Sequence, residues 1–211
     1  TCALPILHAE QTIDAAGLEI YPGFVDAHSH IGLDGYGEPG VDINERNDIC
    51  CPQLRAIDGV NPMDESFVYA RSAGITCVCT GPGSANVLGG TFTAIKTAGT
   101  RIDDMIVKKE AAMKCAFGEN PKRCYASKCD SSRMTTAAIL REALMKARLY
   151  LQKKEAAGDD VFRQPAFDMK LEALIPVLRG QIPLKAHAHR ADDIFTAIRI
   201  ADEFGVRLTL E

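Results

Sequence analysis

The chain alternates between short β-favouring runs and segments with helical spacing, and this alternation is the strongest constraint on its fold. Six apolar or β-branched runs predict strands at 23–31, 75–80, 92–96, 112–117, 183–189 and 206–211. Apolar residues three and four positions apart predict helices at 65–73, 135–155, 168–178 and 192–204. Strands alternating with helices favour an α/β fold with a parallel sheet, which is either doubly wound or closed as a barrel.

Composition places the chain among ordinary globular proteins. Of its 211 residues 46% are hydrophobic and 25% charged, and its formal net charge is −4. This slightly acidic balance, without a basic cluster longer than Lys153 and Lys154, argues against nucleic acid or a membrane surface as a partner. No apolar run approaches the roughly 20 residues that cross a bilayer, and no signal-peptide pattern is present. We therefore expect a cytoplasmic homo-oligomer that acts on a small-molecule substrate.

Eight cysteines bear on the redox state. Three of them lie in apolar, strand-like runs, where a thiol behaves as a small hydrophobic group. Cys77 and Cys79 are separated by one residue rather than two, and no second pair stands at zinc-ribbon distance. We therefore expect reduced thiols and no zinc knuckle. The eight are Cys2, Cys50, Cys51, Cys77, Cys79, Cys115, Cys124 and Cys129.

Four of the five histidines form two His-x-His pairs, each late in a predicted strand. Side chains two residues apart in a strand share a face, so His28 and His30 can hold one divalent metal, and so can His187 and His189. Parallel α/β folds place their functional sites at this end of the strands. The alternative is two pairs of hydrogen-bonded histidines without a metal.

The fourth predicted strand adds two further candidates. Lys114 lies in an otherwise apolar run, where an unpaired ammonium is unfavourable, so it must be paired, modified or placed at the mouth of the fold. Glu119 follows just after this run. A carboxylate at this point would bridge two metals, and we favour Glu119 as its source over a carbamate on Lys114. A solvated charge is the alternative for each residue.

The glycine-rich loop 81–90 does not have the pattern of a nucleotide-binding loop. It lacks the Lys-Ser/Thr ending of a P-loop and the spacing of a dinucleotide-binding turn. Its glycines either let the backbone approach a substrate or form tight turns. A doubly wound nucleotide-binding domain would need phosphate contacts from this loop. Covalent catalysis is disfavoured because no Gly-x-Ser-x-Gly elbow or Cys-His signature is present.

Several strings resemble motifs of one family. The string 21–30, Tyr-Pro-Gly-Phe-Val-Asp-Ala-His-Ser-His, resembles the first-strand signature of the amidohydrolase superfamily, metal-dependent hydrolases that include imidazolonepropionase-like and prolidase-like enzymes. The string 185–194 resembles its fifth-strand motif, and 205–211 resembles the approach to its sixth strand. The segment from 118–123 to the long helix is similar to imidazolonepropionase-like members. The resemblance covers nearly the whole chain.

The resemblance implies a (β/α)₈ TIM barrel with a small flanking β-sandwich. It also implies hydrolysis of an amide, a cyclic amide or a related C–N bond by metal-activated water. One or two zinc ions are expected, and iron, manganese or nickel are alternatives because imidazole and carboxylate ligands suit them all. The implied metal ligands are His28, His30, His187, and either Glu119 or a carboxylated Lys114. His189 would be a further ligand or a substrate contact, and Arg190 could bind a substrate carboxylate or form a helix-surface salt bridge.

The chain departs from the family pattern in its extent. The family expects a sixth-strand histidine directly after Glu211 and an eighth-strand aspartate as general base, and the chain ends before both. Residues 1–22 are expected to be the end of the β-sandwich, with 12–20 as its last strand. Residues 23–211 would form strands one to six of an incomplete barrel, since a complete one takes about 250 residues. The alternative function is a non-catalytic metal-binding barrel that serves as a subunit or scaffold.

Overall fold

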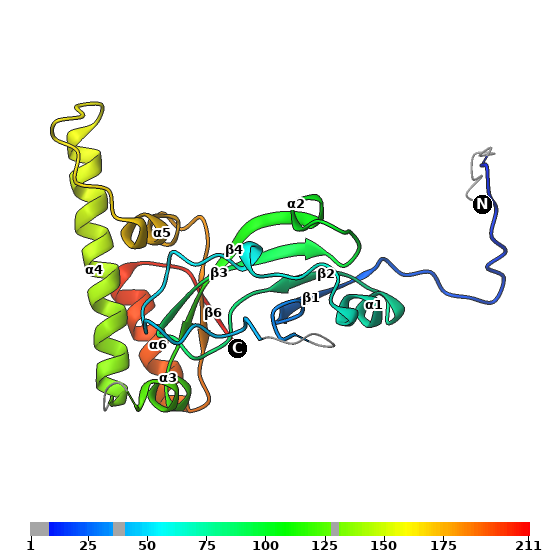
Figure 1. Cartoon of the computed structure of the whole chain (residues 1–211), viewed down its shortest axis with the longest axis horizontal. Helices are drawn as coiled ribbons and strands as arrows, with labels where there is room; N and C mark the ends of the chain where they lie inside the picture. Colours follow the sequence, from blue (N-terminus) through cyan, green and yellow to red (C-terminus); the bar gives the residue numbers. More distant parts are fainter. Residues whose placement is uncertain (1–8, 36–40, 128–130) are drawn as a thin grey trace, which may run out of the picture.

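The computed structural model describes residues 9–35, 41–127 and 131–211, which form one curled, open six-stranded sheet with helices packed against it (Figure 1). The strands follow one another across the sheet in chain order. They are β1 (Phe24–Ser29), β2 (Ile75–Thr80), β3 (Leu88–Lys96), β4 (Ile106–Ala116), β5 (Leu184–His187) and β6 (Leu208–Leu210). The fold is therefore mixed α/β, as predicted, with β1 and β6 as the edges of the described sheet.

Seven helices connect or flank the strands. They are the 3₁₀ helix η1 (Ala56–Asp58), α1 (Glu65–Ser72), α2 (Ile102–Met105), α3 (Glu119–Tyr125), α4 (Arg133–Ala157), α5 (Met169–Leu178) and α6 (Ala191–Phe204) within the described ranges. The sequence predicted α1, α4, α5 and α6 but not η1, α2 or α3. Within the described part of the chain, no helix is both long and apolar enough to span a bilayer.

The sheet is mixed rather than fully parallel, which corrects the sequence expectation. Strand β3 runs antiparallel to both β2 and β4, whereas the pairs β1–β2, β4–β5 and β5–β6 are parallel. The connections 81–87 and 97–105 explain the reversal, because a parallel crossover needs about a dozen or more residues. Five strands therefore run parallel to one another, as the strands of a (β/α)₈ barrel do, and β3 runs the opposite way between β2 and β4.

The larger hydrophobic core lies between the sheet and α4, α5 and α6, which stand together on one side of it (Figure 1). On α4, Leu140, Leu144 and Ala147 recur at helical spacing and are fully or almost fully buried. The sheet contributes Met113 and Cys115 of β4 to the same core. A smaller core packs α1 and the loop after β1 against β2 and β3. Because strand residues alternate between faces, residue 114 must point to the side opposite the larger core.

Helix boundaries follow the capping residues. Ser132 forms a capping box with Thr135, so α4 begins at Arg133, two residues before the predicted start. Asp168 accepts hydrogen bonds from the first backbone amides of α5. Gly205, with φ +62°, ends α6 in the left-handed conformation that glycine adopts most easily.

The predicted strand at 12–20 is not formed. The described residues before β1 make a turn at Ala16 and Gly17 but pair with no strand, and they lead away from the sheet (Figure 1). The side chains of Ile13, Leu18 and Ile20 are 71–83% exposed. The β-favouring residues are present, but a strand also needs a neighbour to accept and donate its backbone hydrogen bonds. The division of the chain into sandwich and barrel segments stays a prediction.

The described cysteines are free thiols, in agreement with the expectation. These are Cys50, Cys51, Cys77, Cys79, Cys115 and Cys124, whereas Cys2 and Cys129 lie outside the described residues. Burial raises the pKa of the Cys50 and Cys51 thiols to about 11 and that of Cys115 to about 12. These three thiols therefore stay protonated at neutral pH and act as apolar groups.

We expect Leu144→Ala to destabilise the chain by about 2–5 kcal/mol, because the side chain is 0% exposed and its removal leaves a cavity under α4. Leu149→Ala on the same helix is the matched control, since Leu149 is 51% exposed. Urea denaturation followed by circular dichroism measures both changes. Equal losses of unfolding free energy in the two variants would contradict the assigned core.

Candidate active site

The candidate site lies on the side of the sheet opposite the larger core, at the carboxyl ends of the parallel strands. His28 is the second-to-last residue of β1, His187 ends β5, and Glu211 directly follows β6. Lys114 lies near the end of β4, which pairs with β5 so that Ala116 is beside His187. Residues 183 positions apart in the sequence are thus brought to one edge of the sheet.

Glu211 is the centre of the cluster. Its two carboxylate oxygens lie in close contact with His28 Nδ1 and with Lys114 Nζ, and the contact with Lys114 is an ion pair. Lys185 Nζ lies 3.6 Å from Oε2, and His187 Nδ1 lies 3.8 Å from Oε1. The Lys114 side chain is 0% exposed and that of Glu211 is 8% exposed. The requirement that Lys114 be paired, which its apolar sequence context imposed, is met by a residue 97 positions away.

The polar atoms of this cluster fit a divalent metal in their chemistry. His28 Nδ1, Lys114 Nζ and both oxygens of Glu211 are buried and in close contact, but none makes a hydrogen bond of ordinary geometry. Imidazole nitrogen and carboxylate oxygen are zinc ligands. Among the described residues, however, no three His, Cys, Asp or Glu side chains are already arranged around a metal position.

His30 is oriented by the glycine-rich loop. Its Nδ1 lies 2.7 Å from the carbonyl oxygen of Gly81. A carbonyl only accepts, so Nδ1 carries the proton and Nε2 keeps its lone pair. Metal-binding histidines are held by the same kind of contact. A Cβ at Gly81 would also lie 2.3 Å from the Phe92 ring, so this loop needs glycine to pass beside the site.

The other histidine pair is held by a residue that the sequence did not single out. The Asn120 amide Nδ2 lies 3.0 Å from His187 Nε2, and His189 Nε2 lies 3.0 Å from the same atom. The two imidazole rings meet edge to face, with centroids 4.5 Å apart. His187 therefore turns Nδ1 toward Glu211 and Nε2 toward Asn120 and His189.

Phe92 forms the apolar wall of the cluster. Its fully buried ring stacks on His28 with centroids 5.4 Å apart, and it lies edge-on to His30. Lys114 Nζ and Lys185 Nζ lie 5.7 and 5.4 Å from the ring centroid, within cation–π range. The ring excludes water from one side of the polar cluster and so strengthens the interactions within it.

Burial dominates the electrostatics of the cluster. Burial, followed by the charges of Lys114 and Lys185, lowers the pKa of His28 to about 3. Burial and then Lys114 lower the pKa of His187 to about 4, and burial also lowers the pKa of His30. Burial lowers the pKa of the Lys114 ammonium to about 7. The three imidazoles are therefore neutral at pH 7, the form that binds metals.

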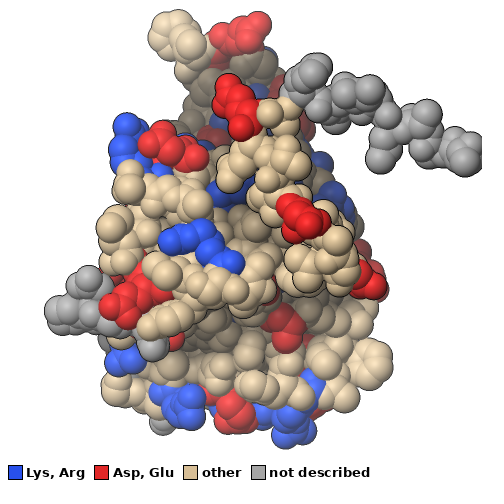
Figure 2. All heavy atoms as spheres, turned by 90° about the vertical axis from the view of Figure 1, so that its right-hand side faces the viewer, with Lys and Arg blue, Asp and Glu red and all other residues tan. Residues whose placement is uncertain are grey.

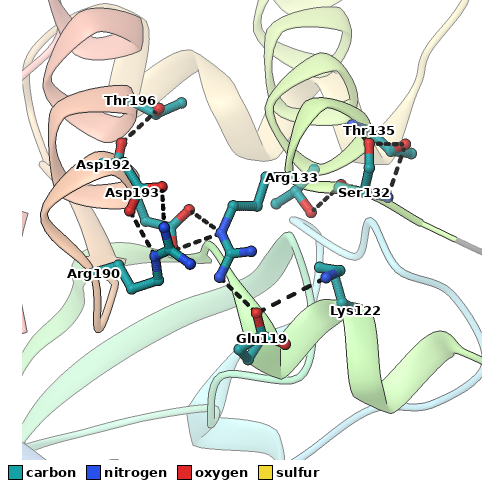
Figure 3. A network of polar contacts seen from close by, with 10 residues as sticks. Glu119, Lys122, Ser132, Arg133, Thr135, Arg190, Asp192, Asp193 and Thr196 are labelled. Atoms are coloured by element: carbon teal, nitrogen blue, oxygen red, sulfur yellow. Dashed lines mark hydrogen bonds and ion pairs between the residues drawn. The ribbon is translucent and has the colours of Figure 1, made fainter.

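The structure does not bring Glu119 and Arg190 into the cluster. Glu119 begins α3 with its side chain 60% exposed, and its carboxylate binds Arg133 at 2.6 Å (Figure 3). Arg190 binds Asp192 through two hydrogen bonds of 2.9 Å. Among the described residues, Lys114 rather than Glu119 lies beside the histidines. The ion pair between Glu119 and Arg133 depends on how α3 and α4 pack, which could not be inferred from the sequence around Glu119.

Sequence reasoning missed Glu211, Lys185, Asn120 and Phe92. One signal pointed to Lys185 and Glu211: polar residues alternate with apolar ones at Lys185 and His187 in β5, and at Thr209 in β6 and Glu211 directly after it. The partner of each side chain depends on strand order, which the sequence does not reveal.

A cavity of about 610 Å³ lies beside the cluster. The described part of the loop after β1 forms one wall, with Asp42, Asn44 and Arg55, and Pro82 and Gly89 belong to the other. A Cβ at Gly89 would lie 3.6 Å from Lys114 Cγ, so the second wall separates the cavity from the cluster by a single layer of chain. The volume is typical of small-molecule sites.

No family model matches the sequence. The chain is similar to the amidohydrolase tasK of Hapsidospora irregularis, with 32% identity over 216 residues that cover 90% of this chain and 22% of that protein. It is also similar to the crystal structure of an amidohydrolase from Thermotoga maritima MSB8, with 43% identity and a TM-score of 0.86 over 96% of this chain. This chain belongs to the amidohydrolase superfamily.

Membership of the amidohydrolase superfamily confirms the resemblance carried by the two His-x-His strings. The narrower placement among imidazolonepropionase-like or prolidase-like enzymes stays a prediction. The chain spans 22% of the curated relative and 56% of the structural one, so it corresponds to a part of each.

The free energy of unfolding is expected to fall as the pH is lowered from about 6.5 toward 4. His28 and His187 have pKa values of about 3 and 4 in the folded protein, but imidazoles titrate near 6.5 in an unfolded chain. Between these values the unfolded state binds more protons, so acid destabilises the fold by at most about 1.4 kcal/mol per pH unit for each histidine. His28, with its side chain 33% exposed, contributes less because solvent screens it.

Urea denaturation between pH 4 and 7 measures this dependence. Because carboxylates also titrate at acid pH, the wild-type slope is compared with that of a His28→Gln/His187→Gln double variant. The histidine contribution is the difference between the two slopes. Identical slopes would contradict the assignment of buried, neutral imidazoles.

Proposed function

We propose that this chain carries the metal-binding centre of a hydrolase that cleaves an amide, a cyclic amide or a related C–N bond. The amidohydrolase names of its relatives support the reaction class. The observation that carries the proposal is the convergence of His28, His187 and Lys114 on the buried carboxylate of Glu211. Such a concentration of buried nitrogen and oxygen donors is unfavourable unless a ligand or function compensates for it.

The residues that would hold a divalent metal are His28, His30 and His187, together with a carboxylate. When bound, the metal would supply polarisation of the scissile carbonyl and a lowered pKa for the attacking water. Zinc suits imidazole and carboxylate ligands, and so do iron, manganese and nickel. The carboxylate would come from Glu211 or from a carbamate on Lys114, which lies within the cluster, whereas Glu119 is turned toward Arg133.

Burial prepares Lys114 for carbamate formation. Burial lowers the pKa of this amine to about 7, which favours the neutral, nucleophilic form. Attack of this nitrogen on CO₂ forms an N–C bond and releases one proton, for which the adjacent carboxylate of Glu211 is an acceptor. The product places an anion where the structure now has an amine.

The cavity of about 610 Å³ is the proposed substrate site. Its wall at Gly89 adjoins Lys114, which places the cavity next to the cluster. His189 is a proposed substrate contact because its ring lies against His187. Arg190 could bind a substrate carboxylate only by exchanging its present partner Asp192.

Metal content by plasma mass spectrometry tests the proposal. We expect one or two divalent ions per chain after equilibration with zinc and removal of excess metal. The His28→Ala/His187→Ala double variant should lose them, because two of the imidazole ligands are gone. His8→Ala, which removes the one histidine outside the two pairs, is the matched control and should keep them.

Equal metal content in the wild type and the double variant would contradict the proposed centre, as would absence of metal from both. The hydrolytic part is tested separately on the full-length gene product with a panel of amides and cyclic amides. A metal-loaded protein that hydrolyses none of them would favour the scaffold function instead.

A carbamate on Lys114 is a further expected outcome. Equilibration with zinc and ¹³C-bicarbonate should give one carbamate carbonyl resonance in the ¹³C spectrum, which Lys114→Ala should abolish. Lys146→Ala is the control because Lys146 lies on the surface of α4 and binds Glu142. A resonance that persists in Lys114→Ala would show that another amine is modified, and absence of the resonance from the wild type would leave Glu211 as the carboxylate ligand.

A further inference from the structure

Asn120 contacts the nitrogen of His187 that faces away from Glu211. Its amide lies 3.0 Å from His187 Nε2, while His187 Nδ1 lies 3.8 Å from Glu211 Oε1. Neither the metal site nor the substrate contacts proposed above include Asn120. Asn120 is the second residue of α3. The start of α3 is joined to α4 and α6 by the ion pairs that Arg133 makes with Glu119 and Asp193.

The two neighbours of His187 specify the same tautomer. The amide Nδ2 of Asn120 only donates, so it requires a lone pair on Nε2. The carboxylate of Glu211, 3.8 Å from Nδ1, is too far for a hydrogen bond, but its negative charge favours a proton on Nδ1. His189 Nε2, 3.0 Å from His187 Nε2, is compatible with this arrangement as a second donor.

Glu119, which directly precedes Asn120 in the chain, forms an ion-pair clamp with Arg133 and Asp193 (Figure 3). Arg133 Nη2 binds Glu119 Oε1 at 2.6 Å, and Arg133 Nε binds the two oxygens of Asp193 at 3.1 and 3.2 Å. Asp193 is 4% exposed, and burial strengthens its pairing with Arg133. The clamp joins the first residues of α3, α4 and α6, and Asn120 directly follows the residue that it fixes.

The turn before α3 completes the clamp. Gly118 has φ +76°, and a Cβ at this position would lie 2.5 Å from Asp193 Oδ2. Only glycine adopts this backbone without strain and leaves the space that the Asp193 carboxylate occupies. The chain can therefore leave β4 and enter α3 in direct contact with α6.

We propose that Asn120 is a positioning residue that fixes the ring and tautomer of His187, and that the clamp of Glu119, Arg133 and Asp193 holds it there. The effect is that His187 always turns Nδ1 toward Glu211. The value of this arrangement for hydrolysis rests on the proposed function, but the arrangement itself does not.

The tautomer of His187 is measured by two-bond ¹H–¹⁵N correlation spectra of the metal-free chain near pH 7.5. We expect the Nδ1–H pattern in the wild type. Asn120→Asp places an acceptor at Nε2, so the ratio of the Nδ1–H to the Nε2–H form should fall by about tenfold or more, the effect of one charge-assisted hydrogen bond. Asn120→Ala should give a mixture of both forms. An Nε2–H wild type, or a wild-type pattern in Asn120→Ala, would overturn the proposal.

Two further variants separate positioning from general stability. Arg123→Ala on the exposed side of α3 should keep the wild-type pattern, and a change there would mean that any disturbance of α3 has this effect. Arg133→Lys, which cannot bind both carboxylates with a guanidinium fork, should shift the ratio in the same direction as Asn120→Ala. A wild-type pattern in Arg133→Lys would remove the clamp from the proposal. Because no metal is added, these outcomes are independent of the metal-content test of the proposed function.

Discussion

The buried contact between Lys114 and Glu211 is the interaction on which the candidate site depends. It joins the end of β4 to the residue after β6, and through His28 and His187 it also reaches β1 and β5. Removing one member of a buried ion pair costs about 3–5 kcal/mol, yet an apolar pair in the same place is often no less stable. Stability alone therefore does not explain why this cluster of charges lies inside the sheet, whereas a catalytic or metal-binding role does.

The same strands build the core and the site on opposite faces. In β4, Met113 and Cys115 pack under α4 and α5, and Lys114 between them lies in the polar cluster. The long helix α4 thus braces the strand that carries the lysine, and its first residue, Arg133, also fixes the start of α3. On the face seen in Figure 2, basic and acidic side chains are interspersed among uncharged ones, so the concentrated charge of the chain lies in the buried cluster rather than in this described surface.

Local patterns predicted the elements, and long-range contacts decided the site. The strand at 75–80 and the histidine pairs follow from residue type and alternation, and the apolar context of Lys114 required a partner. The identity of that partner, Glu211, depends on strand order. The reversal of β3 could have been inferred from its short connections. The strand predicted at 12–20 does not form because it has no neighbouring strand in the described residues, which its own sequence could not indicate. Glu119 matched a ligand by position alone, and Arg133 and α3 direct it elsewhere.

An anomalous difference map at the zinc absorption edge, from crystals of the chain grown with zinc, tests the central claim most directly. The account predicts a peak within the cluster, about 2.0–2.2 Å from nitrogen atoms of His28 and His187 and from an oxygen of Glu211 or of a carbamate on Lys114. Zinc bound elsewhere in the same fold, with the Lys114–Glu211 contact unchanged and no peak beside it, would contradict the account.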